Sequence, residues 1–170
     1  LRQGLNLFSS SYSRLQTALA GYLGVPVLGL ASSGRTALYF LLKSLTQASE
    51  LAGRREVLLP AYTCPSLVKV TLDAGLRPRL IDISAQTLAF EVDQLEAALS
   101  QQTLAVICVH PFGLPQEMDI IIRLVRQVGA LVIEDAAQAL GARMGGRPVG
   151  TRGDFGLFSL GPGKPISTGG

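Results

Sequence analysis

The stretch from Leu131 to Gly170, LVIEDAAQALGARMGGRPVGTRGDFGLFSLGPGKPISTGG, decides the fold of this chain. It opens with an apolar run that predicts a buried strand, and the acidic pair Glu134-Asp135 follows at the carboxyl end of that strand. Open α/β sheets bind their ligands at this end of the strands. A second apolar run predicts another strand that contains Ser159 and leads into a Gly-Pro-Gly-Lys turn with Lys164. We therefore expect a carboxylate, a hydroxyl and a lysine at neighbouring strand ends.

Together these groups meet the needs of pyridoxal phosphate chemistry. In that chemistry a lysine holds the cofactor as a Schiff base, and a carboxylate keeps the pyridine nitrogen protonated so that the ring acts as an electron sink. Hydroxyls and helix-terminal amides hold the phosphate. Each group alone has a simpler interpretation, with Glu134-Asp135 as a solvated or helix-capping pair and Lys164 as an exposed charge. The combination favours a cofactor site.

The sequence around these groups carries a family pattern. IEDAAQALGA at residues 133–142 is followed by a basic, glycine-rich turn, by GDFGLFSL at residues 153–160 and by a Gly-Lys pair. In order, spacing and chemistry these motifs resemble the DegT/DnrJ/StrS family of sugar aminotransferases, within fold type I of the pyridoxal phosphate enzymes. Typical members read EDAAQAHGA, then GDAGCFSF, then Pro-Gly-Lys or Pro-Val-Lys before a glycine-rich strand.

The resemblance implies an activity and its partners. A protein of this kind binds pyridoxal 5'-phosphate and transfers an amino group from an amino acid, with glutamate as the expected donor, to a nucleotide-linked keto sugar. It forms a homodimer with active sites at the subunit interface. Some relatives carry histidine in place of the Schiff-base lysine and are dehydratases, so the presence of Lys164 favours transamination.

The resemblance also implies roles for single residues. Lys164 is the expected Schiff-base lysine and acid/base, and Asp135 is the expected partner of the pyridine nitrogen. Gln138 corresponds to a family residue near the phenolic oxygen of the cofactor, and Ser159 corresponds to a phosphate ligand. Since Glu134 neighbours Asp135 along a strand, we expect its side chain on the opposite face of the sheet.

A further phosphate contact is expected in a turn of small residues, 31–36, that opens a helix. The free amides and the dipole of a helix N-terminus attract an anion. From the residues alone, ordinary serine capping is the favoured interpretation. The resemblance instead implies that Gly34, Arg35 and Thr36 contact the phosphate, although Arg35 stands where typical members have a small residue.

Three more residues are candidates for the wall of the cofactor pocket. Members of the family often read Pro-Ala-Tyr-Thr-Phe where this chain has Pro60 to Cys64, and their aromatic residue stacks on the cofactor ring. Cys64 cannot stack in this way, and Tyr62 has two open interpretations, a substitute ring or core packing. His110 is the only histidine, which excludes a metal site with several histidines, and we expect it to line the pocket. No metal site is predicted.

The remaining chain alternates short apolar strands with helices. The expected strands cover residues 25–30, 56–60, 77–83, 104–109, 131–135 and 155–160, and the expected helices cover residues 15–23, 36–45, 92–99 and 118–128 with one more ending at Gly75. This alternation predicts an α/β fold of three layers, a mainly parallel sheet with helices on both faces. The large cofactor domain of fold type I aminotransferases has this architecture.

Composition limits the other possibilities. A hydrophobic content of 48% and a charged content of 16% indicate a globular fold. The net charge is +3 and the basic residues are scattered, so we predict no nucleic-acid partner. Cys64 and Cys108 are expected to be buried thiols in a reducing compartment. No apolar stretch is long enough for a membrane span, and we predict a cytoplasmic protein without a membrane partner.

The chain is expected to be truncated. It starts without methionine and ends at residues 168–170, where typical members continue into a strand, and those members are more than twice as long. Residues 1–170 would then form part of the large cofactor domain, without the C-terminal small domain, and would be weakly active or inactive alone. The alternative is a non-catalytic or truncated relative that keeps the cofactor-domain fold. A generic nucleotide-binding domain is disfavoured because no GxGxxG or P-loop motif is present.

Overall fold

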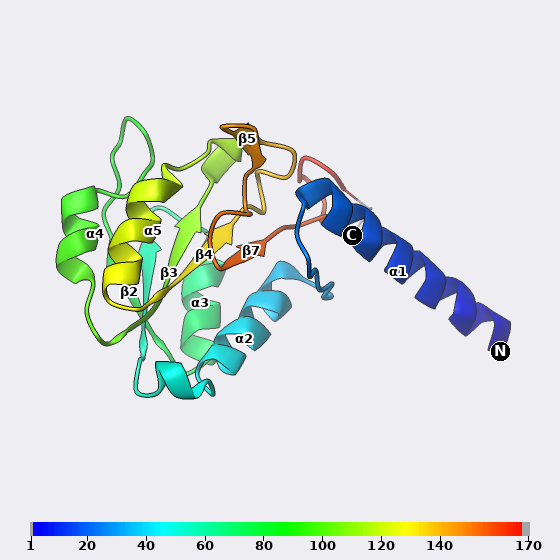
Figure 1. Ribbon diagram of the computed structural model, residues 1–170, viewed down its shortest axis with the longest axis horizontal. Helices are drawn as coiled ribbons and strands as arrows, with labels where there is room; N and C mark the ends of the chain where they lie inside the picture. Colours follow the sequence, from blue (N-terminus) through cyan, green and yellow to red (C-terminus); the bar gives the residue numbers. More distant parts are fainter. Residues whose placement is uncertain (1, 168–170) are drawn as a thin grey trace. The chain divides into compact units, whose positions relative to one another are not determined.

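The computed structural model describes residues 2–167, with side chains from residue 11 onward. Residues 168–170, where we expected a further strand, lie outside this range. The chain divides into two compact units, Leu1–Ser32 and Ser33–Gly170 (Figure 1). In the described part, no helix is both long and apolar enough to cross a membrane.

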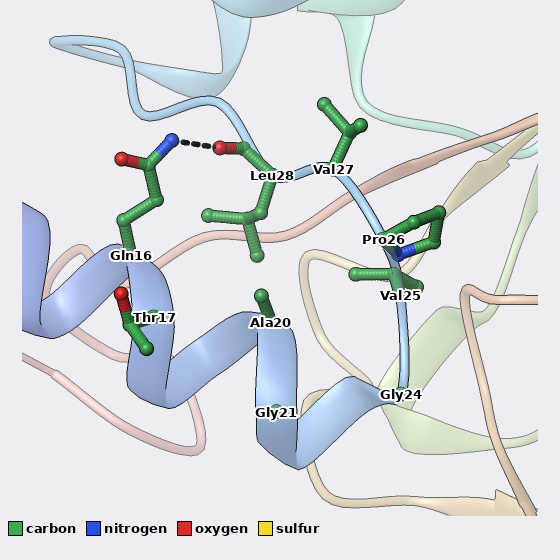
Figure 2. A pocket seen from close by; sticks show the side chains of 9 residues that line it. All are labelled: Gln16, Thr17, Ala20, Gly21, Gly24, Val25, Pro26, Val27 and Leu28. Atoms are coloured by element: carbon green, nitrogen blue, oxygen red, sulfur yellow. Dashed lines mark hydrogen bonds between the residues drawn. The ribbon is translucent and has the colours of Figure 1, made fainter.

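The first unit consists of one helix and an extended segment. Helix α1, Arg2–Leu23, includes the predicted helix and is followed by Gly24, whose φ of 67° suits glycine. The strand that we predicted over residues 25–30 is wrong, because this extended segment pairs with no strand in the described structure. Two of its carbonyl groups instead accept hydrogen bonds from side chains of α1. The hydroxyl of Tyr12 donates to the carbonyl of Leu30, and the amide of Gln16 donates to the carbonyl of Leu28 (Figure 2).

The second unit is built around one parallel sheet. Its elements are α2 (Gly34–Leu45), η1 (Ser49–Leu51), β1 (Glu56–Pro60), α3 (Pro65–Asp73), β2 (Arg77–Ile81), α4 (Val92–Ala98), β3 (Thr103–Val109), η2 (Pro111–Gly113), α5 (Met118–Gln127), β4 (Leu131–Asp135), β5 (Arg143–Met144), β6 (Arg147–Pro148) and β7 (Phe155–Leu157). The main sheet has the order β2-β1-β3-β4-β7, and all of its pairings are parallel. Strands β5 and β6 form a separate antiparallel hairpin.

Helices cover both faces of the sheet, which confirms the predicted three layers (Figure 1). Because side chains alternate along a strand, Val57 and Leu59 of β1 pack on the side of α2 and α3, and Leu58 packs on the side of α4 and α5. Strand β3 is buried on both faces, so its sequence is an unbroken apolar run.

One strand is shorter than the sequence pattern suggested. We predicted a strand over residues 155–160, but β7 ends at Leu157. Its partner β4 ends at Asp135, and the next amide along the chain, that of Ala136, donates to the carbonyl oxygen of Leu157 at 2.8 Å. Beyond this bond the chain has no neighbouring strand to pair with, so Ser159 lies in the loop that follows β7.

Candidate active site

The predicted site residues gather at the carboxyl edge of the parallel sheet. Asp135 is the last residue of β4, and His110 follows directly after β3. Cys64 lies in the loop after β1, while Ser159 and Lys164 lie in the loop after β7. Because parallel strands place their carboxyl ends at one edge, residues from four separate parts of the sequence meet here.

Asp135 is a partly buried carboxylate at this edge. Its Oδ1 accepts a hydrogen bond of 3.0 Å from the backbone amide of Ala137. Burial raises the pKa of Asp135 above its ordinary value, and the Ala137 amide and the positive charge of Lys164 oppose part of this rise. Since burial disfavours the ionised form of Asp135, a cationic partner would stabilise that form.

Lys164 and Cys64 both lie within electrostatic range of Asp135. The backbone amide of Lys164 donates to the carbonyl oxygen of Gly161 at 3.3 Å, which closes the predicted turn. A hydrogen bond with Ser66 lowers the pKa of the Cys64 thiol, and the charge of Lys164 adds to this effect. The amine, the thiol and the carboxylate thus share one site.

The prediction that both cysteines are buried is wrong for one of them. Cys108 is buried in the sheet, whereas Cys64 is exposed, and both are free thiols. Cys64 directly precedes the first residue of α3, in the loop that follows β1.

The N-terminus of α2 lies in the turn of small residues where we predicted a phosphate contact, and that contact stays a prediction. Ser33 is the N-cap, and its Oγ accepts a hydrogen bond of 3.1 Å from the backbone amide of Thr36. The amides of Gly34 and Arg35 belong to the first turn, so they have no acceptor within the helix. The Arg35 side chain is exposed. Helix α2 packs against β7, the strand that leads to Ser159.

The cap of α2 provides a first test. Replacing Ser33 with alanine removes the acceptor of the Thr36 amide, and we expect the free energy of unfolding to fall by about 1 kcal/mol. The measurement is urea unfolding followed by circular dichroism. Ser44→Ala in the last turn of the same helix is the control, because the Ser44 hydroxyl only donates to the carbonyl of Leu41. Equal losses in the two variants would contradict a capping role for Ser33.

The other predicted pocket residues occupy distinct positions. Tyr62 is 58% exposed, so core packing is excluded as its role. The Oε1 atom of Gln138 accepts a hydrogen bond of 2.9 Å from the amide of Phe112, which fixes the loop after β3. Ser159 is partly exposed, and its Oγ accepts a hydrogen bond of 3.4 Å from the amide of Gly161. Their contacts with a cofactor stay predictions.

His110 is buried and bonded through both ring nitrogens. Its Nδ1 lies 3.1 Å from the backbone amide of Gln116, and a backbone amide can only donate. The ring proton must therefore be on Nε2, which donates to Oε2 of Glu134 at 2.9 Å. Neither nitrogen is left for a ligand, and a role for the ring as a pocket wall stays a prediction.

Glu134 is the residue that the sequence pattern undervalued. As predicted, it lies on the opposite face of the sheet from Asp135, among the residues that pack under α4 and α5. It is fully buried, and its carboxylate accepts hydrogen bonds from His110 and from three backbone amides. A sequence signal does exist, because Gly150, Gly153 and Gly156 recur at every third position of the segment that surrounds this carboxylate.

Comparisons with known proteins find relatives of this chain. The model of the DegT/DnrJ/EryC1/StrS aminotransferase family matches residues 4–170. Over 156 residues the chain is 36% identical to the UDP-N-acetyl-3-dehydro-alpha-D-glucosamine 3-aminotransferase of Acidithiobacillus ferrooxidans, and the match covers 92% of this chain and 41% of that protein.

Two solved structures show the same fold. The aminotransferase from Psychrobacter cryohalolentis superposes with a TM-score of 0.82 at 29% identity, over 93% of this chain and 39% of the other. The Escherichia coli GDP-4-keto-6-deoxy-D-mannose-3-dehydratase with bound hydrated PLP superposes with a TM-score of 0.83 at 25% identity, over 91% of this chain and 40% of the other. The chain thus spans about two fifths of the length of these relatives.

Proposed function

The chain belongs to the DegT/DnrJ/EryC1/StrS aminotransferase family, and from this we propose that it forms the cofactor-binding part of a pyridoxal 5'-phosphate-dependent transaminase. The amino donor would be an amino acid, with glutamate expected, and the acceptor a nucleotide-linked keto sugar. The observation that carries the proposal is that β4 ends at Asp135 and its paired strand β7 leads into the loop with Lys164, at the ligand-binding edge of the sheet. The partial large domain, the homodimer and the cytoplasmic location stay predictions.

The residues at this edge suit the chemical groups of the cofactor. A partly buried carboxylate, Asp135, matches a cationic ring nitrogen, and the primary amine of Lys164 matches an aldehyde. The first-turn amides of α2 and the hydroxyl of Ser159 are donors suited to a phosphate. A cofactor with a cation, an aldehyde and a phosphate would therefore find a partner for each of its groups.

When bound, pyridoxal phosphate supplies an electron sink for the electrons released at the α carbon of the amino acid. Asp135 would remain ionised beside the protonated ring nitrogen, since an opposite charge lowers the pKa of a carboxylate. Lys164 would bind the aldehyde through Nζ and, once released, move a proton at the α carbon. Its amine must be partly neutral for both steps.

The ring-stacking position distinguishes this chain from typical family members. Cys64 is near Asp135 and Lys164, but a thiol offers little surface to an aromatic ring. Tyr62 lies two residues earlier in the same loop with its ring exposed, so it is available to cover the cofactor. We propose that Tyr62 takes this role in place of an aromatic residue at position 64.

Covalent labelling of the lysines tests the proposed function. The chain has only three lysines, Lys43, Lys69 and Lys164, so a modified residue can be assigned by peptide mass spectrometry. After addition of pyridoxal phosphate and reduction with borohydride, we expect visible absorption before reduction and a stable label on Lys164. Lys164→Ala should lose the label.

The other lysines serve as matched controls. Lys69 is exposed and paired with Asp73, so Lys69→Ala should leave the label on Lys164 unchanged. A label spread equally over the three lysines, or no adduct at saturating cofactor, would overturn the proposal. The second outcome would favour the alternative of a relative that keeps the fold without the chemistry.

A further inference from the structure

The carboxylate of Glu134 binds four donors from two separate parts of the chain. Oε2 accepts from Nε2 of His110 at 2.9 Å and from the amide of Gly150 at 3.0 Å. Oε1 accepts from the amides of Arg152 and Gly153, both at 2.6 Å. Each oxygen therefore has two donors, which is about the full capacity of an ionised carboxylate.

The electrostatics agree with an ionised Glu134. Burial by itself would raise the pKa of this carboxyl group, but the hydrogen bonds from His110, Gly153 and Arg152 more than offset the effect and lower the pKa below its ordinary value. Several amides arranged around one anion form a concave binding site of the kind that proteins also use for phosphates. Here a side chain of the protein itself occupies that site.

The segment from residue 150 to residue 154 can surround Glu134 because two of its residues, Gly150 and Gly153, lack a side chain. A Cβ atom on Gly153 would lie 2.9 Å from the carbonyl oxygen of Val132, and one on Gly150 would lie 2.5 Å from the Phe158 ring. Gly150 also has a φ of 88°, which strongly favours glycine. The glycines thus permit the close approach that brings the amides to the carboxylate.

The same segment is attached to β4 by a second carboxylate. Oδ2 of Asp154 accepts from the amide of Val132 at 2.7 Å, and the amide of Asp154 donates to the carbonyl oxygen of Val132 at 2.8 Å. Strand β7 follows at once, paired to β4 with Glu134 opposite Gly156 and Asp135 opposite Leu157. The position of β7 along β4 is therefore fixed by the contacts of residues 150–154.

His110 joins the other side of the site to the same carboxylate. Its ring donates to Glu134, while its backbone amide donates to the carbonyl oxygen of Asp135 at 3.0 Å. The end of β3, the end of β4 and the start of β7 are thus connected through Glu134. Lys164 lies only seven residues beyond the end of β7.

From these contacts we propose that Glu134 is a positioning residue that sets the distance between Lys164 and Asp135 by holding the glycine-rich segment 150–154 and His110 against β4. This inference rests on the proposed function. These two adjacent residues of β4 would have different roles, since Asp135 faces the cofactor side and Glu134 holds the loop that leads to Lys164.

Glu134→Gln tests the proposal sharply. Each carboxylate oxygen of Glu134 accepts from two donors. Whichever way the glutamine amide is turned, its NH₂ group, which is itself a donor, must face two of them. We expect the affinity of the protein for pyridoxal phosphate, measured by the visible absorption of the Lys164 adduct, to fall by about 10- to 100-fold. Small displacements of reacting groups have effects of this size. Lys164 and Asp135 remain chemically unchanged in this variant.

A matched control carboxylate lies at the other edge of the sheet. Glu56 at the start of β1 pairs with Arg77 at 3.7 Å, so Glu56→Gln should leave the adduct affinity unchanged. If wild type forms no adduct, the proposed function itself fails. If wild type forms it and Glu134→Gln binds with equal affinity while folded, the inference about Glu134 alone is overturned.

Milder variants keep the test decisive if Glu134→Gln does not fold. His110→Asn retains an acceptor for the Gln116 amide but deletes the donor to Glu134, whereas His110→Gln can restore a donor at the Nε2 position. We expect His110→Asn to weaken the adduct by a few-fold and His110→Gln to restore part of this loss. Equal affinities in wild type and His110→Asn would contradict the proposal.

Discussion

Replacing Gly156 with alanine is expected to destabilise the second unit by about 3 kcal/mol, at the upper end of the cost of inserting atoms into a packed region. A Cβ atom on Gly156 would lie 1.9 Å from the carbonyl oxygen of Gly150 and 3.0 Å from its carbon. Both contacts are with backbone, so no side chain can rotate away. The strand and the glycine-rich segment would have to separate.

Urea unfolding followed by circular dichroism measures this effect. Gly161→Ala is the control, because a Cβ atom there would meet only Ser159 Oγ at 3.6 Å, an ordinary contact. The midpoint should shift strongly for Gly156→Ala and little for Gly161→Ala. A small effect of Gly156→Ala would mean that β7 does not approach residue 150 as closely as the structure describes.

Most of the fold was predictable because a parallel sheet has a simple sequence pattern. Apolar runs such as that of β3 are buried on both faces, and glycines mark the ends of helices α1, α3 and α5. The predicted strand over residues 25–30 failed for a physical reason. A strand requires a neighbouring strand, and local apolar content cannot report whether one is present. The end of β7 at Leu157 was missed for the same reason, since its partner β4 ends first.

The positions of Asp135 and Lys164 were predictable, but the hydrogen bonds that surround Glu134 were not. Asp135 and Lys164 follow apolar strands, so the topology brings them to one edge. The sequence pattern placed Glu134 on the far face but could not show that four donors would surround it, because three of these are backbone amides of residues 150–153. Backbone donors carry no residue-type signal, and only the spacing of the glycines indicates that the chain passes close to another element.

The exposure of Tyr62 and Cys64 could not be predicted from the sequence either. Both lie in one loop, and their sequence neighbours do not determine which side chain is covered. The structure leaves both exposed at the edge of the sheet. Of the two, Cys64 interacts electrostatically with Asp135 and Lys164.

Asp135→Asn is expected to have opposite effects on cofactor binding and on stability. The amide keeps the shape of the carboxylate, and its oxygen can still accept from the Ala137 amide. It removes the negative charge opposite the ring nitrogen, however, and breaking a buried charge pair costs about 3–5 kcal/mol. We therefore expect the affinity for pyridoxal phosphate to fall by about 100-fold or more.

In the cofactor-free protein, Asp135→Asn is expected to increase stability. Burial raises the folded-state pKa of Asp135 above its unfolded value, so ionisation of this group opposes folding. Its contribution to stability declines as the pH rises from the unfolded pKa to the folded pKa, and it remains low at neutral pH. Asparagine does not ionise, so the cofactor-free variant should be more stable than wild type at neutral pH, and the difference should disappear on acidification.

Both effects can be measured in one series of proteins. Cofactor affinity is titrated by visible absorption from neutral to acidic pH. Protonation of the Lys164 amine should weaken binding in both proteins, and wild type should lose more affinity than the variant because only wild type also protonates Asp135. Urea unfolding without cofactor gives the stability. Asp73→Asn is the control, because Asp73 forms an exposed pair with Lys69 and should change neither quantity appreciably. If Asp135→Asn bound the cofactor as tightly as wild type, Asp135 could not be the partner of the ring nitrogen, whereas weaker binding with greater apo stability would show that this carboxylate is retained for its ligand rather than for the fold.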